Sequence, residues 1–484
     1  MSKPSLGVSA ARGAALTLVT QIARLAVQFV SLIVLARLLV PEDFGLVAMV
    51  LAVVGVAEII REFGLSAAAM QAPELSRSQQ TNLFWINLSL GLVCAVVAIG
   101  VSPLIARLYG DDRLVAVTQV LAIVFLLGGA NAQFRASLSR DLKFSALTLS
   151  ELGASIAGVV VALILAMLGF GYGALVGQQI VTAAVLLVLN FVQSNFRPGL
   201  PKRLVGTRKL LGFGSSVAGT QAISYIGRNA DNFMIGLVWG PVSLGLYSRA
   251  FQFLMLPINQ INVPMTRIAL PVLSKIQGER DRFQSYIQKA QLVSAYVTTS
   301  IFAVAAGLAD PLLTLLLGSE WVGIAPIFAV LAIGGVFRAL NQVSYWIFLS
   351  RGFAGAQLRY SALATPVLIA AMAAGLPWGP VGVAAGHSIG YFFYWLFGLQ
   401  RACKVADVER KPLFALARRS TCIVSIPSGL ICFGITQVIA NSMLQIGVSL
   451  ICVGLYNIVV LFVCSSVRND AEVIFGFVRK AIKR

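Results

Sequence analysis

An apolar segment near the N-terminus carries polar side chains at helical spacing. Gln21, Arg24 and Gln28 follow one another at intervals of three and four residues, so a helix would place them on one face. An arginine near the bilayer centre costs about 2.5–3.5 kcal/mol on insertion scales, a cost that is tolerated where the face lines water or a ligand. Arg24 has no acid within one turn of its own helix, which favours a cavity or ligand role.

A second apolar segment, about 200 residues further on, repeats this pattern. Gln221, Arg228 and Asp231 share one helix face, with Tyr225 beside them. Here an alternative is open, because Arg228 and Asp231 are three residues apart and can neutralise each other. Both segments nevertheless present a polar stripe with an arginine near its middle.

Charged residues within the apolar segments are mostly arginines. Arg249, Arg267 and Arg338 add to the two above, whereas few acids lie in such segments. This excess predicts a cationic cavity suited to an anion, because a planar guanidinium matches phosphate oxygens. Glu58 and Asp231 are the acids that coupling to H+ or Na+ would use. A local ion-pair cluster with Arg61 and Glu62 is the alternative for Glu58.

The elements that position these residues are membrane helices. The chain is 58% hydrophobic and 11% charged, where a soluble protein carries roughly 25% charged residues. Its apolar segments are continuous and long enough to cross a ~30 Å hydrocarbon core. We therefore expect an all-α integral membrane protein with about fourteen transmembrane helices. They cover residues 11–38, 42–62, 80–105, 113–134, 146–169, 172–194, 210–239, 243–274, 285–309, 322–348, 356–376, 380–402, 419–440 and 443–466.

An internal duplication organises these helices. Pro41 and Gly45 recur as Pro241 and Gly245, and further matches follow in the same order at slightly larger offsets. The pattern predicts two parallel six-helix lobes, an arrangement that many transporters place around a central site. The predicted parts are an N-terminal lobe (1–194), a basic cytoplasmic linker (195–209), a C-terminal lobe (210–403), a second basic linker (404–418), an extra helix pair (419–466) and a basic amphipathic tail (467–484).

The placement of basic residues predicts the topology. Most of the 37 lysines and arginines fall in loops on one side of the membrane, while Arg37, Arg107 and Arg113 fall on the other. The positive-inside rule makes the crowded side cytoplasmic and places both termini there. The net charge of +19 then reflects topology and attraction to anionic lipid, and nucleic-acid binding is not expected.

Several kinds of chemistry are not expected. The six cysteines form no CxxC pair and there is no Walker A sequence, so we expect no metal site, no cofactor and no ATP hydrolysis. His387, the single histidine, is interpreted as a packed or hydrogen-bonded side chain. The short outer loops argue against a membrane-embedded polymerase or glycosyltransferase, so the chain is not expected to be an enzyme.

Four runs of residues resemble a known family. They are Leu38–Leu46, Phe84–Leu88, Ser139–Phe144 and Leu244–Ala250. In combination they are similar to bacterial Wzx-type polysaccharide flippases, in the subgroup of exopolysaccharide and colanic-acid exporters. That family belongs to the multidrug/oligosaccharidyl-lipid/polysaccharide exporter superfamily, whose members have two six-helix lobes that rock around a central cavity.

The resemblance implies a function in the bacterial cytoplasmic (inner) membrane. It implies alternating access that flips an undecaprenyl-diphosphate-linked oligosaccharide to the outer leaflet, for exopolysaccharide or lipopolysaccharide biosynthesis. A polysaccharide polymerase and chain-length or export proteins are the candidate partners. The position and chemistry of the residues, and not the resemblance, give the candidate ligands. For the diphosphate they are Arg24, Arg228, Arg249 and Arg338, and for the sugars they are Gln21, Gln28, Gln221, Tyr225 and Asn341. The alternative is a cation-coupled drug or metabolite antiporter, which would need a carboxylate-lined cavity.

Overall fold

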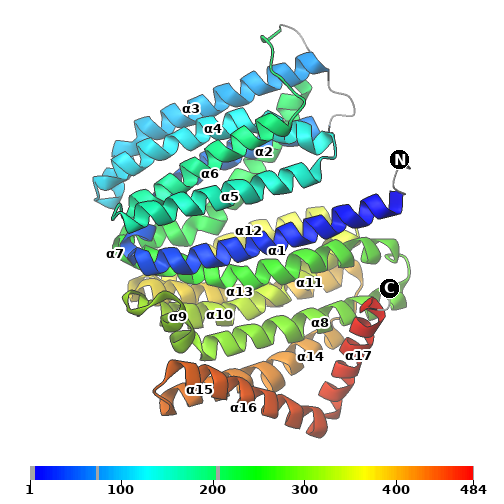
Figure 1. Ribbon diagram of the computed structural model, residues 1–484. Helices are drawn as coiled ribbons and strands as arrows, with labels where there is room; N and C mark the ends of the chain where they lie inside the picture. Colours follow the sequence, from blue (N-terminus) through cyan, green and yellow to red (C-terminus); the bar gives the residue numbers. More distant parts are fainter. Residues whose placement is uncertain (1–5, 72–75, 203–207, 483–484) are drawn as a thin grey trace. The chain divides into compact units, whose positions relative to one another are not determined.

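The computed structural model describes residues 6–71, 76–202 and 208–482, with side chains over 20–57, 76–202, 225, 227–474 and 476. Throughout these ranges the regular elements are helices (Figure 1). The all-α class expected from the sequence is therefore confirmed. The chain divides into two compact units, Met1–Gly245 and Leu246–Arg484.

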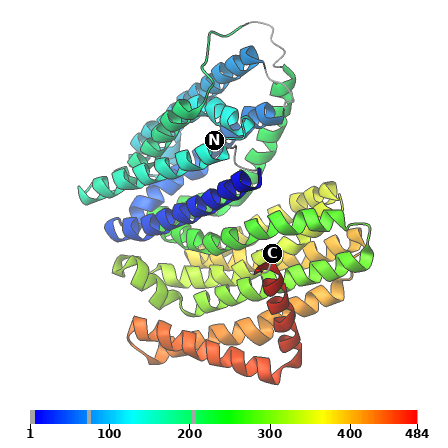
Figure 2. The same cartoon turned by 45° about the vertical axis from the view of Figure 1, so that its right-hand side comes forward.

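Unit 1 is built from long helices that pack as sequential hairpins. Its helices are α1 (Leu6–Leu38), α2 (Pro41–Gln71), α3 (Arg77–Tyr109), α4 (Arg113–Arg140), α5 (Phe144–Met167), α6 (Tyr172–Gln193) and the first part of α7 (Arg208–Lys275). The α3–α4 and α5–α6 pairs lie side by side, and α1 packs on α5 (Figures 1 and 2). A capping box between Ser76 and Gln79 begins α3, and Gly110 ends it in the left-handed conformation.

Unit 2 continues α7 and adds the C-terminal helices. They are α8 (Arg280–Gly307), α9 (Ala309–Leu317), α10 (Ile324–Leu340), α11 (Gln342–Ser350), α12 (Ala354–Gly375), α13 (Gly379–Ala406), α14 (Arg410–Arg418), α15 (Ile426–Val438), α16 (Ser442–Val463) and α17 (Ser465–Ile482). Its core centres on α8, α10 and α13, and α15 packs on both α8 and α16.

Ten stretches within the described side-chain ranges are long and apolar enough to cross a membrane. The stretch 354–406 contains two helices, α12 and α13, and 324–350 contains α10 and α11. The predicted division of α7 into spans 210–239 and 243–274 also holds, because the backbone of Gly240 leaves the helical region with φ 75° and ψ −174°. Only glycine adopts such a conformation readily. The figure of fourteen crossings remains a prediction.

The duplicated Pro and Gly residues meet one another inside unit 1. A Cβ added to Gly45 would overlap the carbonyl oxygen of Pro241, and a Cβ added to Gly245 would overlap that of Pro41. The two copies of the motif therefore contact each other reciprocally, with glycine letting the backbones approach closely. The residues that form the repeat in the sequence thus form a symmetric contact between two helical segments in the structure.

The compact units do not divide at the predicted linker 195–209. The first part of α7 instead packs within unit 1, where the hydroxyl of Tyr225 donates a hydrogen bond to the carbonyl of Leu51 at 2.7 Å. Phe233 also packs edge-on against Tyr109, with ring centroids 6.1 Å apart. The predicted lobe boundaries are drawn from the duplication in the sequence. The boundary of the compact units differs because side-chain contacts hold the first part of α7 to α2 and α3.

An ion-pair cluster fixes the start of α4. Arg113 lies 2.5 Å from Glu42 of α2 and 2.7 Å from Asp111. The hydrogen bond from Arg113 holds the pKa of Asp111 below its usual range. The cluster joins the loop after α3 to the first turn of α2.

The C-terminal tail forms a helix, α17, whose start is bound to unit 2. Asp470, a mostly buried residue, accepts hydrogen bonds from Tyr296 of α8 at 2.8 Å and from Arg419 at 2.9 Å. Val467 is buried beside it. The beginning of the tail is therefore packed against protein, while its placement on the inner leaflet remains a prediction.

Candidate functional site

Three charged side chains from three helices meet in unit 1. Nη1 of Arg24 on α1 lies 2.6 Å from Oε2 of Glu151 on α5. The other carboxylate oxygen, Oε1, lies 3.6 Å from Nη2 of Arg135 on α4. The side chains of Arg24, Arg135 and Glu151 are 54%, 46% and 27% exposed, so the cluster is open to a ligand.

The carboxylate of Glu151 is shared by two guanidinium groups from different helices. An exposed ion pair contributes only about 0–1 kcal/mol, so an incoming anion can replace Glu151 at little cost. A phosphate group offers more acceptor oxygens than a carboxylate and can engage a guanidinium with two parallel hydrogen bonds.

The predicted polar stripe of α1 surrounds Arg24. Gln21 and Gln28, three residues before and four residues after it, are both exposed, whereas Thr20 and Ser31 are buried. The helix therefore presents amides on either side of the guanidinium. This combination can hold an anionic group and hydrogen-bond neutral hydroxyls next to it.

The matching stripe of α7 is placed differently. The Tyr225 hydroxyl is engaged with Leu51, and Asp231 is 3% exposed with Oδ1 accepting the backbone N–H of Asn232 at 2.8 Å. Arg228 is exposed. The side chains of Gln221 and Glu58 lie outside the described residues.

A second cationic group lies in unit 2, where Arg338 and His387 share two aromatic rings. The Arg338 guanidinium lies 5.6 Å from the ring centroid of Phe251 and 5.0 Å from that of Tyr391. The ring of His387 lies 5.7 Å and 4.6 Å from the same two centroids. The aromatic faces stabilise the arginine by cation–π contact in the interior of the unit.

Two further predicted ligands in unit 2 lie on separate contacts. Arg249, which is half-buried, donates to Oε1 of Gln252 at 2.5 Å. Asn341 lies at the junction of α10 and α11, and its Oδ1 has no hydrogen-bond partner among the described residues. Packing between apolar helices alone does not explain the presence of these two polar side chains.

His387 is packed, which is one of the two states that the sequence interpretation allowed. It is 2% exposed and packed, as expected, but neither ring nitrogen has a hydrogen-bond partner within the described part of the chain. Burying such a group without a partner is unfavourable. His387 lies beside the same two rings as Arg338, which is 49 positions earlier in the sequence, and no local spacing pattern predicts this proximity.

The sequence reasoning missed the role of Arg135. The helix α4 continues through Arg140 and carries Arg135 to Glu151 of α5. A partner 127 residues away from Arg24 cannot be read from i, i+3 or i, i+4 spacing.

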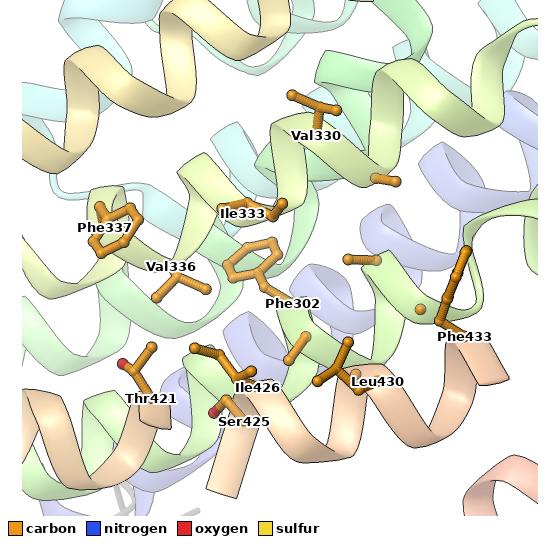
Figure 3. Close-up of a pocket in the computed structure, with 15 residues that line it drawn as sticks. Phe302, Val330, Ile333, Val336, Phe337, Thr421, Ser425, Ile426, Leu430 and Phe433 are labelled. Atoms are coloured by element: carbon orange, nitrogen blue, oxygen red, sulfur yellow. The ribbon is translucent and has the colours of Figure 1, made fainter. Parts of the chain in front are cut away.

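An apolar groove of about 320 Å³ lies between α8, α10 and α15 of unit 2 (Figure 3). Phe302 projects into it between Ile333 of α10 and Ile426 of α15. Thr421 and Ser425 supply hydroxyl groups toward one end (Figure 3). Its lining suits a hydrocarbon chain.

Residues 34–326 match the model of the family described as "Polysaccharide biosynthesis protein". The lipopolysaccharide biosynthesis protein WzxC of Escherichia coli (strain K12) is 24% identical over 364 residues, or 75% of this chain and 73% of that protein. The teichuronic acid biosynthesis protein TuaB of Bacillus subtilis (strain 168) is 26% identical over 302 residues, or 61% of this chain and 62% of that protein.

The fold is also similar to that of a solved structure. The lipid II flippase MurJ in its inward closed conformation superposes with a TM-score of 0.73 at 14% identity, over 93% of this chain and 99% of that one. This likeness, together with the ten apolar stretches, supports a multi-pass membrane protein. Because the family model matches more than half of the chain, over residues 34–326, the chain belongs to the polysaccharide biosynthesis protein family.

Proposed function

We propose that the protein moves undecaprenyl-diphosphate-linked oligosaccharides across the cytoplasmic membrane, without itself acting as an enzyme. The observation that carries this proposal is the exposed cluster in which Arg24 and Arg135 both contact the carboxylate of Glu151. Because the two guanidinium groups are about half exposed, a phosphate can compete with Glu151 for them. Two relatives are named for lipopolysaccharide and teichuronic acid biosynthesis, which supports a polysaccharide precursor as the substrate.

The three chemical parts of such a substrate find matching groups on the protein. The diphosphate suits Arg24 and Arg135, and the sugar hydroxyls suit the exposed amides of Gln21 and Gln28. In unit 2, taken by itself, the apolar groove between α8, α10 and α15 offers a surface that suits a hydrocarbon chain. Arg228, Arg249, Arg338 and Asn341 remain further candidate ligands in this proposal.

Alternating access would follow from the exchange of anions. Without substrate, Glu151 pairs with the two arginines. With substrate, the diphosphate takes its place and the carboxylate is released. The diphosphate then shifts the conformational equilibrium by binding one of the two conformations more tightly than the other. Coupling to H+ or Na+ through Glu58 or Asp231 is the proposed source of energy.

A cation-coupled drug antiporter fits these residues less well. A cationic drug would require a free carboxylate, but the carboxylate at this site, Glu151, lies between two arginines. The site therefore repels cations and favours anions.

Polysaccharide export in cells that depend on this chain tests the proposal. Arg24→Ala should reduce export sharply, and Arg24→Lys should restore it only in part, because lysine has no planar two-pronged donor. Arg107→Ala, which removes an exposed arginine of α3 outside the cluster, is the matched control. Normal export by Arg24→Ala at normal membrane abundance would overturn the assignment of the site.

A further inference from the structure

A basic groove of about 510 Å³ lies between the end of α13 and α14 in unit 2. From α14 it is lined by Arg410, Lys411, Phe414 and Arg418, and from α13 chiefly by Leu396. All three basic side chains are exposed. Positive charge and apolar surface are thus combined in one groove.

Helix geometry explains why α14 presents this face. Arg410, Phe414 and Arg418 recur every four residues, so they form one row along the helix. The opposite face carries Leu413 and Leu416, which are buried. Gln291 of α8 anchors that side by donating a hydrogen bond to the Leu413 carbonyl at 2.9 Å. The basic row is therefore held outward by packing behind it.

Within the described part of the chain, no acid neutralises the positive charge of the groove. Among the described residues, no carboxylate lies within ion-pair distance of Arg410, Lys411 or Arg418. The nearby acid Asp407 pairs with Arg280 at 3.3 Å. Glu409 directly precedes Arg410, and its backbone N–H donates a hydrogen bond to Oε1 of Gln284.

The apolar side of the groove, formed by Phe414 and Leu396, is also held in a defined position. The ring of Phe414 packs on Trp395 of α13, with centroids 5.5 Å apart. Because Trp395 is buried, Phe414 is held against the helix and its remaining surface faces the groove with Leu396. A ligand that fills the groove must offer both an anionic group and hydrocarbon.

We propose that this groove binds an anionic phospholipid of the bilayer, with Arg410, Lys411 and Arg418 on its phosphate and Phe414 and Leu396 against its acyl chain. Basic pockets between membrane helices bind such headgroups, and basic residues near an anionic membrane surface attract them. A sugar-bearing lipid fits less well, because Gln400 is the one uncharged polar side chain that lines the groove. The proposal rests on the groove and not on the transport function.

Native mass spectrometry of the purified full-length chain tests this site. We expect dioleoylphosphatidylglycerol to bind at least about tenfold more tightly than dioleoylphosphatidylcholine, because three basic residues contribute to recognition. The triple variant Arg410→Gln, Lys411→Gln, Arg418→Gln should lose that preference. The control Lys275→Gln, Lys289→Gln, Arg359→Gln removes three exposed charges elsewhere in unit 2 and should keep it.

Each other outcome contradicts the proposal. Equal binding of the two lipids would show that the headgroup is not recognised, and an unchanged preference in the triple variant would place recognition elsewhere. Inorganic pyrophosphate should fail to displace the lipid, since it has no acyl chain, and full displacement would identify a free phosphate site instead. If the triple variant does not fold, the single charge reversal Arg418→Glu should weaken phosphatidylglycerol binding, and normal binding there would count against the site.

Discussion

The Nη1 atom of Arg24 on α1 lies 2.6 Å from the Oε2 atom of Glu151 on α5, and the two residues are 127 positions apart in the sequence. The same carboxylate lies 3.6 Å from Arg135. Glu151 thus contacts two exposed arginines, and in the proposed function a diphosphate would compete with it for them.

Replacing Glu151 with glutamine should strengthen anion binding. Glu151→Gln keeps the size of the side chain but frees the arginines, and removing one charge at about 4 Å in water is worth roughly 1 kcal/mol, or about fivefold in affinity. Titration calorimetry with inorganic pyrophosphate measures this change. Glu320→Gln, at an exposed acid outside the cluster, should have no effect. Weaker pyrophosphate binding by Glu151→Gln would contradict an exchange of anions.

The reciprocal contact of the repeated motif should be sensitive to a single methyl group. Gly45→Ala and Gly245→Ala each place a Cβ against a proline carbonyl, and overpacking of this kind costs about 1–3 kcal/mol. Thermal unfolding in detergent should show both variants to be less stable than Gly100→Ala, since Gly100 has open space around it. Equal stability of the three variants would refute the close contact.

Filling the apolar groove should impair export without preventing insertion. Ala306 of α8 lines the groove, and Ile301 on the same helix is exposed outside it. Ala306→Trp should reduce export about tenfold, which corresponds to roughly 1.4 kcal/mol of lost binding, while Ile301→Trp should export normally. Export is compared with membrane abundance by immunoblot. Normal export by Ala306→Trp would remove the groove from the substrate path.

The predicted orientation can be tested with an impermeant thiol reagent added to intact cells. In a cysteine-free background, Asp112→Cys in the loop before α4 should be labelled, and Gly278→Cys in the turn before α8 should not. Both positions are exposed on the protein. The opposite pattern would invert the topology drawn from the basic loops.

Much of the fold could be predicted from the sequence because it follows from local patterns. The length of the apolar segments predicted the helices, and the recurrence of Pro41 as Pro241 predicted the duplication. The reciprocal contact between these motifs could not be predicted, since a repeat does not specify which surfaces meet. The division at Gly245 likewise depends on side-chain packing, such as the hydrogen bond of Tyr225 to Leu51.

The site was predicted less completely for the same reason. The shared face of Gln21, Arg24 and Gln28 is a property of one helix and could be read directly. Arg135 and Glu151 come to Arg24 through tertiary packing of α4 and α5. His387 similarly joins Arg338 through the rings of Phe251 and Tyr391. Residues brought together from distant helices leave no spacing pattern in a single sequence.

Transport in reconstituted vesicles tests the central claim most directly. Purified protein is placed in liposomes with an undecaprenyl-diphosphate-linked oligosaccharide, and the sugar that reaches the opposite leaflet is measured by its oxidation with impermeant periodate. The native chain should move the lipid, and the double variant Arg24→Ala, Arg135→Ala should move it at least about tenfold more slowly, because charge-assisted contacts to phosphate are strong. Transport by the double variant at the native rate, or none by the native chain, would contradict the account.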